Sequence, residues 1–142
     1  MIKVNIDNRT KARVPRRLIE AAVVNAAKLL KLKKKHELTI VFVGDKKIRD
    51  LNRKYRAKDN VTDVLSFTDG ELEAGMIYLG DIFIDGAQAR RQAKEKGISE
   101  RKEILILAIH GILHLLGFDH VKKAEAFEME ALELGILTKT YN

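Results

Sequence analysis

The chain contains no cysteine, so disulfide bonds and thiolate metal ligands are both excluded. Any metal ion bound here therefore needs histidine and carboxylate ligands, and a reducing compartment is permitted. Proline occurs once among 142 residues and 46% of the residues are hydrophobic, which indicates a compact globular protein. At this length we expect one domain, spanning residues 1–142.

Long apolar runs are also missing from the sequence. The longest stretch, ILILAIHGILHLL at positions 104–116, contains two histidines and is far shorter than the roughly 20 residues that span a bilayer. The first ten residues lack the basic segment and following apolar run of a secretion signal. The sequence therefore predicts a soluble, cytoplasmic protein with no membrane partner.

Acidic residues are fewer than basic ones. The chain has 20 aspartates and glutamates and 27 lysines and arginines, which gives a formal net charge of +7. This excess favours polyanionic partners, since electrostatic attraction dominates affinity for nucleic acids. The lysine-rich segment KLKKKHE at positions 31–37 is a local charge run. We interpret it as a solvated helix end rather than as a specific binding patch.

Hydrophobic periodicity and turn residues predict the secondary structure. Strands are expected at 1–7, 37–44, 62–67 and 76–85, a polar loop at 68–75, and helices at 16–33, after 45, at 86–97, after 99 and at 122–137. Asp45 and Ser99 are expected to cap the helices that follow them, and Gly97 to close the helix before it. This order of elements predicts a layered α/β or α+β domain with about four strands.

Three of the four histidines stand within the segment HGILHLLGFDH, at positions 110, 114 and 120. Residues four apart share a helix face, with Cβ atoms roughly 5 to 6 Å apart, so His110 and His114 can bind one ion. Gly117 can end the helix in a left-handed conformation, which turns the chain back and makes His120 a third ligand. Three protein ligands with an open fourth position are typical of catalytic zinc. The alternative is two hydrogen-bonded core histidines.

Metzincin-type zinc proteases use the same histidine spacing but place a glutamate directly after the first histidine, as the general base. Gly111 occupies that position here, which excludes the protease mechanism and requires either a metal-activated water or a carboxylate from another segment. Asp81, Asp85 and Asp119 are candidates for this carboxylate, and helix caps or turns are their commoner roles. Gly111 itself either makes space for a substrate or allows close packing against a strand. His36 is interpreted as a surface residue.

Together with LNRKYRAKDNVTDVLSF and YLGDIFID, the histidine motif resembles the YbeY family of bacterial rRNA-maturation endoribonucleases. The match runs from about Leu51 to the C-terminal helix, and the first fifty residues fit the family's layout only loosely. The resemblance implies an α+β fold, with a mixed sheet of about four strands, about five helices and a metzincin-like metal-binding helix. It also implies a zinc-dependent, single-strand-specific endoribonuclease that acts on rRNA and ribosomal subunits in 16S rRNA 3′-end maturation and ribosome quality control.

The family's ligands for one zinc ion fall on His110, His114 and His120, and its RNA-contacting arginine falls on Arg56. The resemblance therefore implies Arg56 and His114 as catalytic residues. Arg56 is chemically suited to this role, because a guanidinium can contact a phosphate bidentately and stabilise developing negative charge. Arginine and lysine residues beside Arg56 extend a basic edge near the expected cleft.

The chain departs from the family's pattern in its loops. Val61 and Thr68 replace the prolines that commonly flank the TDVLSF element, which affects loop rigidity rather than chemistry. The segment between His120 and the last helix looks shortened, which alters the rim of the cleft. Met129 in the last helix lies either beneath the metal, as a methionine does in metzincins, or in the core.

Two alternatives to a nuclease remain. One is an RNA-binding ribosome assembly factor with a structural metal, and the other is a metal-dependent peptidase. Gly111 and the positive charge count against the peptidase. The metal itself stays open, because three imidazoles also accept nickel, copper or iron.

Overall fold

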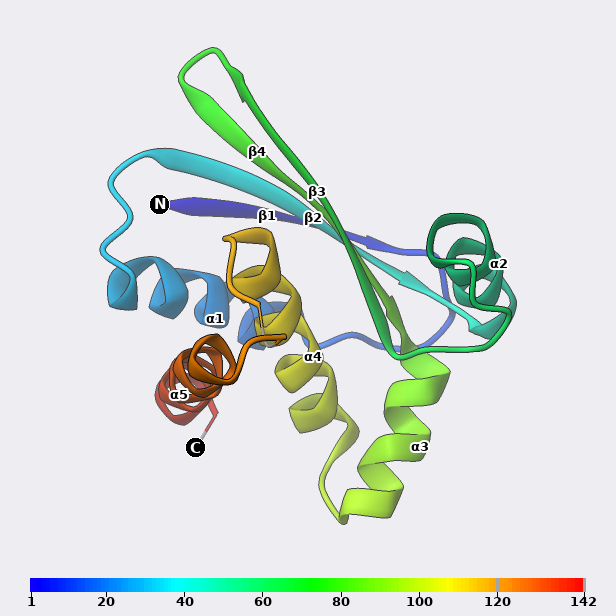
Figure 1. The fold of residues 1–142 in the computed structure, drawn as a ribbon. Helices are drawn as coiled ribbons and strands as arrows, with labels where there is room; N and C mark the ends of the chain where they lie inside the picture. Colours follow the sequence, from blue (N-terminus) through cyan, green and yellow to red (C-terminus); the bar gives the residue numbers. More distant parts are fainter. Residues whose placement is uncertain (120, 142) are drawn as a thin grey trace.

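The computed structural model describes residues 1–119 and 121–141 (Figure 1). Within these residues the chain forms one sheet and five helices. The strands are β1 (Ile2–Asn8), β2 (Lys35–Val43), β3 (Val64–Glu73) and β4 (Met76–Asp85). The helices are α1 (Arg16–Leu29), α2 (Asp45–Arg56), α3 (Gly86–Lys96), α4 (Glu100–Leu115) and α5 (Lys123–Thr140). The prediction of an α+β fold with about four strands and about five helices is confirmed.

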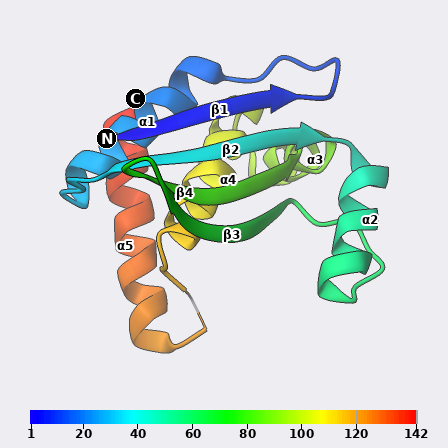
Figure 2. The same ribbon diagram turned by 90° about the horizontal axis from the view of Figure 1, so that it is seen from above.

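The sheet is mixed, as the resemblance implied. Its strand order is β1-β2-β4-β3, with β1, β2 and β4 parallel and β3 antiparallel to β4. Figure 2 shows the strands side by side in this order, with α1, α4 and α5 behind them. Consequently β1 and β3 are the edge strands, and α4 packs beneath β3 and β4.

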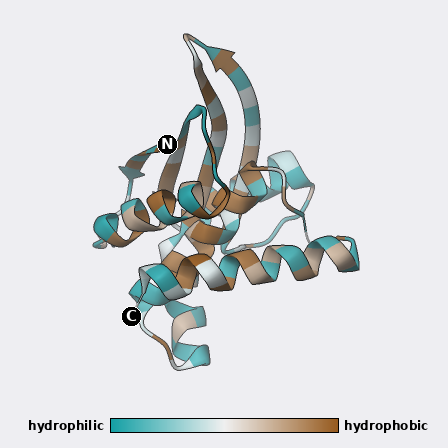
Figure 3. Cartoon of the chain, turned by 90° about the vertical axis from the view of Figure 1, so that its left-hand side faces the viewer, coloured by the Kyte–Doolittle hydropathy of each residue, from teal (hydrophilic) through white to brown (hydrophobic). Residues whose placement is uncertain are grey.

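The two faces of the sheet pack against different helices, because successive strand residues point to opposite faces. Leu38 and Ile40 of β2 lie in the main core with α1, α4 and α5. Val41 and Val43 point the other way and pack with Ile48 of α2. The strands of the β3–β4 hairpin are banded hydrophobic and hydrophilic in Figure 3, as this alternation requires. Helix α2 therefore covers one end of the face opposite α4.

Several helix boundaries follow the sequence-based predictions. Ser99 accepts a hydrogen bond from the Lys102 backbone N–H at 3.1 Å and caps α4, and Gly97 closes α3 at φ 69°. Gly117 follows α4 at φ 98°, in the left-handed region that favours glycine. The first helix is shorter than predicted and ends at Leu29, because Lys31 is left-handed, at φ 53°, and cannot continue it.

Three local predictions are wrong. Residue Gly44, not Asp45, is the N-cap of α2, and Asp45 pairs instead with Arg91 at 2.8 Å. The predicted polar loop at 68–75 is mostly strand, because its residues pair with β4 despite their polar composition. His36, predicted on the surface, is 9% exposed, and its Nδ1 lies 2.9 Å from the Lys34 carbonyl oxygen.

None of the helices in the described part of the chain is both long enough and apolar enough to cross a membrane.

Candidate functional site

Helix α4 positions two of the predicted metal ligands. Its N-terminus is capped by Ser99 and carries acidic side chains in the first turn, which favour the positive end of the helix dipole. His110 and His114 lie one turn apart near its C-terminus, and their ring centroids are 6.2 Å apart at an interplanar angle of 17°. The predicted side-by-side arrangement of these two imidazoles on one helix face is therefore what the structure shows.

A glutamate on α5 orients the first of these rings. Glu133 Oε2 lies 3.1 Å from His110 Nδ1, and both side chains are partly buried. The hydrogen bond to Glu133 raises the pKa of His110, against the lowering effect of burial. With the Nδ1–H donated to a carboxylate, Nε2 is the nitrogen suited to a metal ion, which is the usual arrangement of metal-binding histidines. The sequence analysis did not identify Glu133.

The donor set of the described residues fits a transition-metal ion in part. Two nearly parallel imidazoles, one of them oriented by a carboxylate, are ligands that zinc and related ions prefer. Among residues 1–119 and 121–141, no three histidine, aspartate or glutamate side chains come together as a metal site. The predicted third ligand, His120, lies outside the described residues. The three-histidine site therefore stays a prediction.

The structure decides between the two interpretations of Gly111. A Cβ atom at this position would lie 2.8 Å from the Ile82 Cγ2 atom of β4. Gly111 thus allows α4 to pack closely against the sheet, and the packing explanation holds. Met129 is fully buried in the main core, which is the commoner of its two predicted roles.

A partly buried hydrogen-bond network ties the start of β3 to α3 and α4. Gln92 of α3 donates to Asp63 Oδ2 at 3.2 Å and to Glu103 Oε2 at 2.7 Å. Glu103 is fully buried on α4, and Lys96 Nζ binds it at 2.9 Å. Asp63 also adds, as the smallest contribution, to the raised pKa of His110. The network fixes the segment before β3 relative to the helix that carries the histidines.

Arg56, the predicted catalytic arginine, ends α2 and reaches the edge strand β3. Its Nη2 donates to the Ser66 carbonyl at 2.9 Å, and its guanidinium lies 4.9 Å from the centroid of the Phe67 ring. Tyr55 packs edge-on against the same ring, at 5.2 Å. Arg56 is exposed to solvent. The structure therefore holds its guanidinium at the edge strand β3, over a ring that packs in the cluster on the α2 face of the sheet, with an open side.

Two of the three candidate carboxylates occupy cap or turn positions, and the third, Asp81, lies within β4. Asp85 accepts from the Ala87 N–H and caps α3, and Asp119 Oδ1 accepts from the backbone N–H of Val121 at 3.2 Å. Asp81 accepts from the Tyr78 hydroxyl at 2.6 Å. The contacts of Asp85 and Asp119 are the cap and turn roles that the sequence analysis gave as the alternative, whereas Asp81 is a strand residue bound to a tyrosine. The general base therefore stays unassigned.

Comparison with known proteins gives consistent matches. The family model described as Endoribonuclease YbeY matches residues 3–141, so it includes most of the first fifty residues, for which the sequence resemblance was loose. A protein named Endoribonuclease YbeY from Listeria monocytogenes serotype 4a is 38% identical over 135 residues, which cover 86% of this chain and 84% of that protein. One from Aquifex aeolicus is 49% identical over 89 residues, covering 63% of this chain and 59% of that protein. The solution structure of TM1509 from Thermotoga maritima is similar at a TM-score of 0.67 and 26% identity, covering 99% of this chain and 89% of that one.

Proposed function

The chain belongs to the Endoribonuclease YbeY family, and from this premise we propose that it is a metal-dependent endoribonuclease of single-stranded RNA. The observation that carries the proposal is the pair of parallel imidazoles on α4, one of them hydrogen-bonded to Glu133. The net charge of +7 supports an RNA substrate. We further propose that it acts in the cytoplasm on rRNA and ribosomal subunits, in 16S rRNA 3′-end maturation and ribosome quality control.

We propose one zinc ion per chain, held by His110, His114 and His120; nickel or another divalent metal is chemically compatible with the same donors. When bound, such an ion supplies Lewis-acid stabilisation of negative charge and makes a water molecule more acidic. Glu133 keeps the proton of His110 on Nδ1 and thereby fixes the ring's tautomer and orientation.

Arg56 is proposed to bind the scissile phosphate. Its guanidinium has five N–H donors, and the short contacts to Ser66 and the Phe67 ring fix its position without using all of them. The remaining donors can bind two phosphate oxygens and stabilise the charge that grows on them during cleavage. The Asp63–Gln92–Glu103 network supports this geometry, because it holds the start of β3 in place.

The proposal is tested with Arg56→Glu, assayed on a single-stranded RNA and on its duplex. We expect the wild type to cleave only the single strand, and the variant to keep its metal content and lose about a hundredfold in rate, as when a charge-stabilising donor is removed. Lys47→Glu is the matched control, since Lys47 is exposed on the same helix but near its other end. Cleavage by Arg56→Glu at the rate of the control would remove the arginine from the mechanism.

The second candidate is an RNA-binding ribosome assembly factor with a structural metal, which the positive charge favours equally. It predicts that the wild type binds metal and RNA but cleaves neither substrate. The metal-dependent peptidase has no such support, because Gly111 stands where its general base is needed.

A further inference from the structure

A hollow of about 300 Å³ lies at the other end of α4 from His114. It is bordered by the loop before α1, by the end of β2 and by the first residues of α3 and α4. Arg13 comes from the loop, Arg90 from α3 and Arg101 from α4. Segments that are far apart in the sequence thus bring three arginines to one hollow, away from the histidines.

The side chains around this hollow carry net positive charge. Glu100 is the one acidic residue that lines it, against three arginines, for a net charge of +2. Glu100 Oε1 is already bound by Arg90 Nε at 2.6 Å. Neither Arg13 nor Arg101 forms an ion pair within the residues that the structure describes. Two exposed guanidinium groups therefore remain for an anionic ligand.

Backbone groups add to this positive potential. Pro15, which precedes α1, and the first residues of α3 and α4 all line the hollow. The start of a helix carries a partial positive charge and unsatisfied N–H groups, which favour phosphate. Asp85 caps α3 and Ser99 caps α4, whereas α1 begins with neither a side-chain cap nor an acidic residue in its first turn. The start of α1 is thus the clearest backbone contribution.

The loop before α1, which lines one side of the hollow, has a strongly basic sequence. Residues 9–17, RTKARVPRR, contain five basic residues and no acidic one. Lys11, Arg16 and Arg17 are exposed beside the hollow-lining Arg13. The sequence analysis did not single out this segment.

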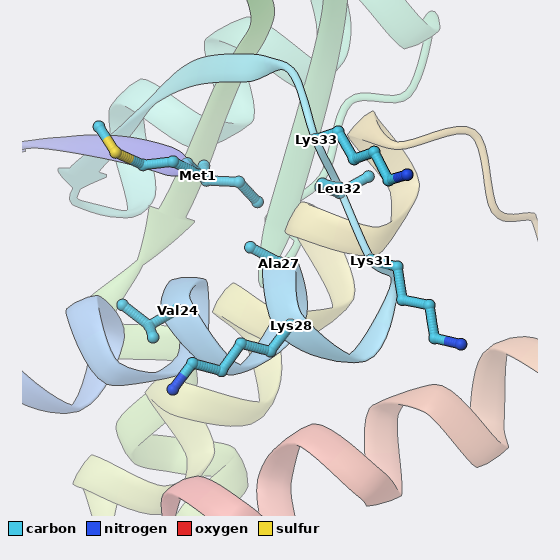
Figure 4. Close-up of a pocket in the computed structure, with 8 residues that line it drawn as sticks. Met1, Val24, Ala27, Lys28, Lys31, Leu32 and Lys33 are labelled. Atoms are coloured by element: carbon cyan, nitrogen blue, oxygen red, sulfur yellow. The ribbon is translucent and has the colours of Figure 1, made fainter.

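The lysine-rich region forms a different kind of surface. A hollow of about 560 Å³ lies between the end of α1 and the start of β1, and Figure 4 shows Lys28, Lys31 and Lys33 around it. Its floor is apolar, with Ile2 and Leu32. RNA phosphates need no such apolar floor, and nothing in the described structure shows what covers it. This surface, lined by three lysines and, among the described residues, no acidic one, therefore serves as a positively charged control at the opposite end of β1.

We propose that the hollow lined by Arg13, Arg90 and Arg101 is a second RNA-binding site, which binds backbone phosphates away from the point of cleavage. This inference rests on the proposed function. Arg101 and His110 are nine residues apart on α4, which is about 14 Å along the axis and about two and a half turns, so they face opposite sides. At roughly 3.4 Å per stacked nucleotide, a strand needs more than about four nucleotides to reach both places.

The test compares Arg13→Glu/Arg101→Glu with the control Lys31→Glu/Lys33→Glu, which changes the net charge equally. Binding of a long single-stranded RNA to metal-depleted protein is measured over a range of salt concentrations. Each lost phosphate contact lowers the salt slope by about 0.7, so we expect a reduction of about 1.4 in the arginine variant and the wild-type slope in the control. Equal slopes in the two variants would overturn the proposal.

Cleavage gives an independent readout. The arginine variant should raise the KM for the long RNA by about tenfold or more and leave cleavage of a four-nucleotide RNA unchanged. Arg13→Gln/Arg101→Gln repeats the test with a milder change, in case the charge reversal impairs folding. Polyglutamate is added as a competitor at the same concentration of negative charges as the RNA. If it displaces the long RNA from the wild type, the site does not recognise RNA. If the wild type cleaves and the arginine variant has the same KM for the long RNA, the second site alone is rejected. If the wild type binds the long RNA but never cleaves it, the proposed function alone is rejected.

Discussion

At the scale of single residues, the site depends on carboxylates that act on neighbouring side chains. Glu133 orients His110 from a different helix, and Asp63 adds to the raised pKa of the same histidine. A second carboxylate pair lies away from the histidines, where Asp85 at the start of α3 meets Asp45 on α2. The contact between Glu133 and His110 leads to a prediction for metal binding, and the contact between Asp85 and Asp45 leads to one for stability.

Glu133→Ala should weaken zinc binding about ten- to a hundredfold, because the carboxylate no longer fixes the His110 ring or increases its basicity. Glu128→Ala is the control, since Glu128 is exposed on the same helix. Competition with a chelator of known affinity measures the effect. Equal zinc affinities in the two variants would mean that Glu133 has no role in holding the metal ligand.

Asp85 makes stability fall as the pH rises. Burial and, next, the contact with Asp45 raise the pKa of Asp85 from 3.8 to about 7. Between pH 4 and pH 7 the folded protein therefore holds a proton that the unfolded chain has lost, so the free energy of unfolding decreases with pH. Asp85→Asn keeps an acceptor for the cap and an N–H for Asp45. It should remove most of this dependence, roughly 4 kcal/mol for a rise in pKa from 3.8 to about 7. Urea denaturation at pH 4, 6 and 8 checks it, and parallel profiles for the two proteins would contradict it.

At the scale of elements, the close contact between α4 and β4 determines where the histidines lie. Gly111 faces Ile82 of β4, and the helix and strand approach too closely for a Cβ atom at this position. A second close approach occurs in the hairpin, where Gly80 has φ 139° and a Cβ atom would overlap the Phe67 carbonyl oxygen. Both glycines allow backbone packing that a side chain would prevent.

Gly111→Ala should destabilise the protein by about 1 to 2 kcal/mol, because overpacking against Ile82 exceeds the roughly 1 kcal/mol gained in helix propensity. In an Ile82→Ala background the colliding atoms are gone, so the same change should be neutral or stabilising. Thermal or urea denaturation of the wild type, the two single variants and the double variant completes the double-mutant cycle. A loss of equal size in both backgrounds would show that this contact is not the cause.

At the scale of the whole molecule, local patterns predicted the elements better than the contacts between them. Helical spacing and the Ser99 cap placed α4 and its two histidines correctly, because both depend on residues within a few turns. Glu133 could not be found this way, since it is 23 residues from His110 and meets it only when α5 packs on α4. The strand at 68–73 was missed because cross-strand pairing with β4 outweighs its polar composition.

The basic residues were predicted as a net charge but not as a surface. Arg13, Arg90 and Arg101 meet only because the ends of strands and the starts of helices gather at one side of the sheet. The sequence resemblance named Arg56, but its contact with Ser66 depends on how α2 packs beside β3. The sequence therefore showed that the chain is rich in arginine and lysine, but only the fold shows which of these residues lie close together.

The most direct test of the account is RNA cleavage by metal-stripped protein, with and without added zinc, beside His114→Ala prepared in the same way. The account predicts that zinc restores cleavage of a single-stranded RNA by the wild type, and that His114→Ala binds less zinc and stays inactive. Equal cleavage by the two proteins, or cleavage by the wild type that does not depend on metal, would show that the histidines of α4 are not the catalytic centre.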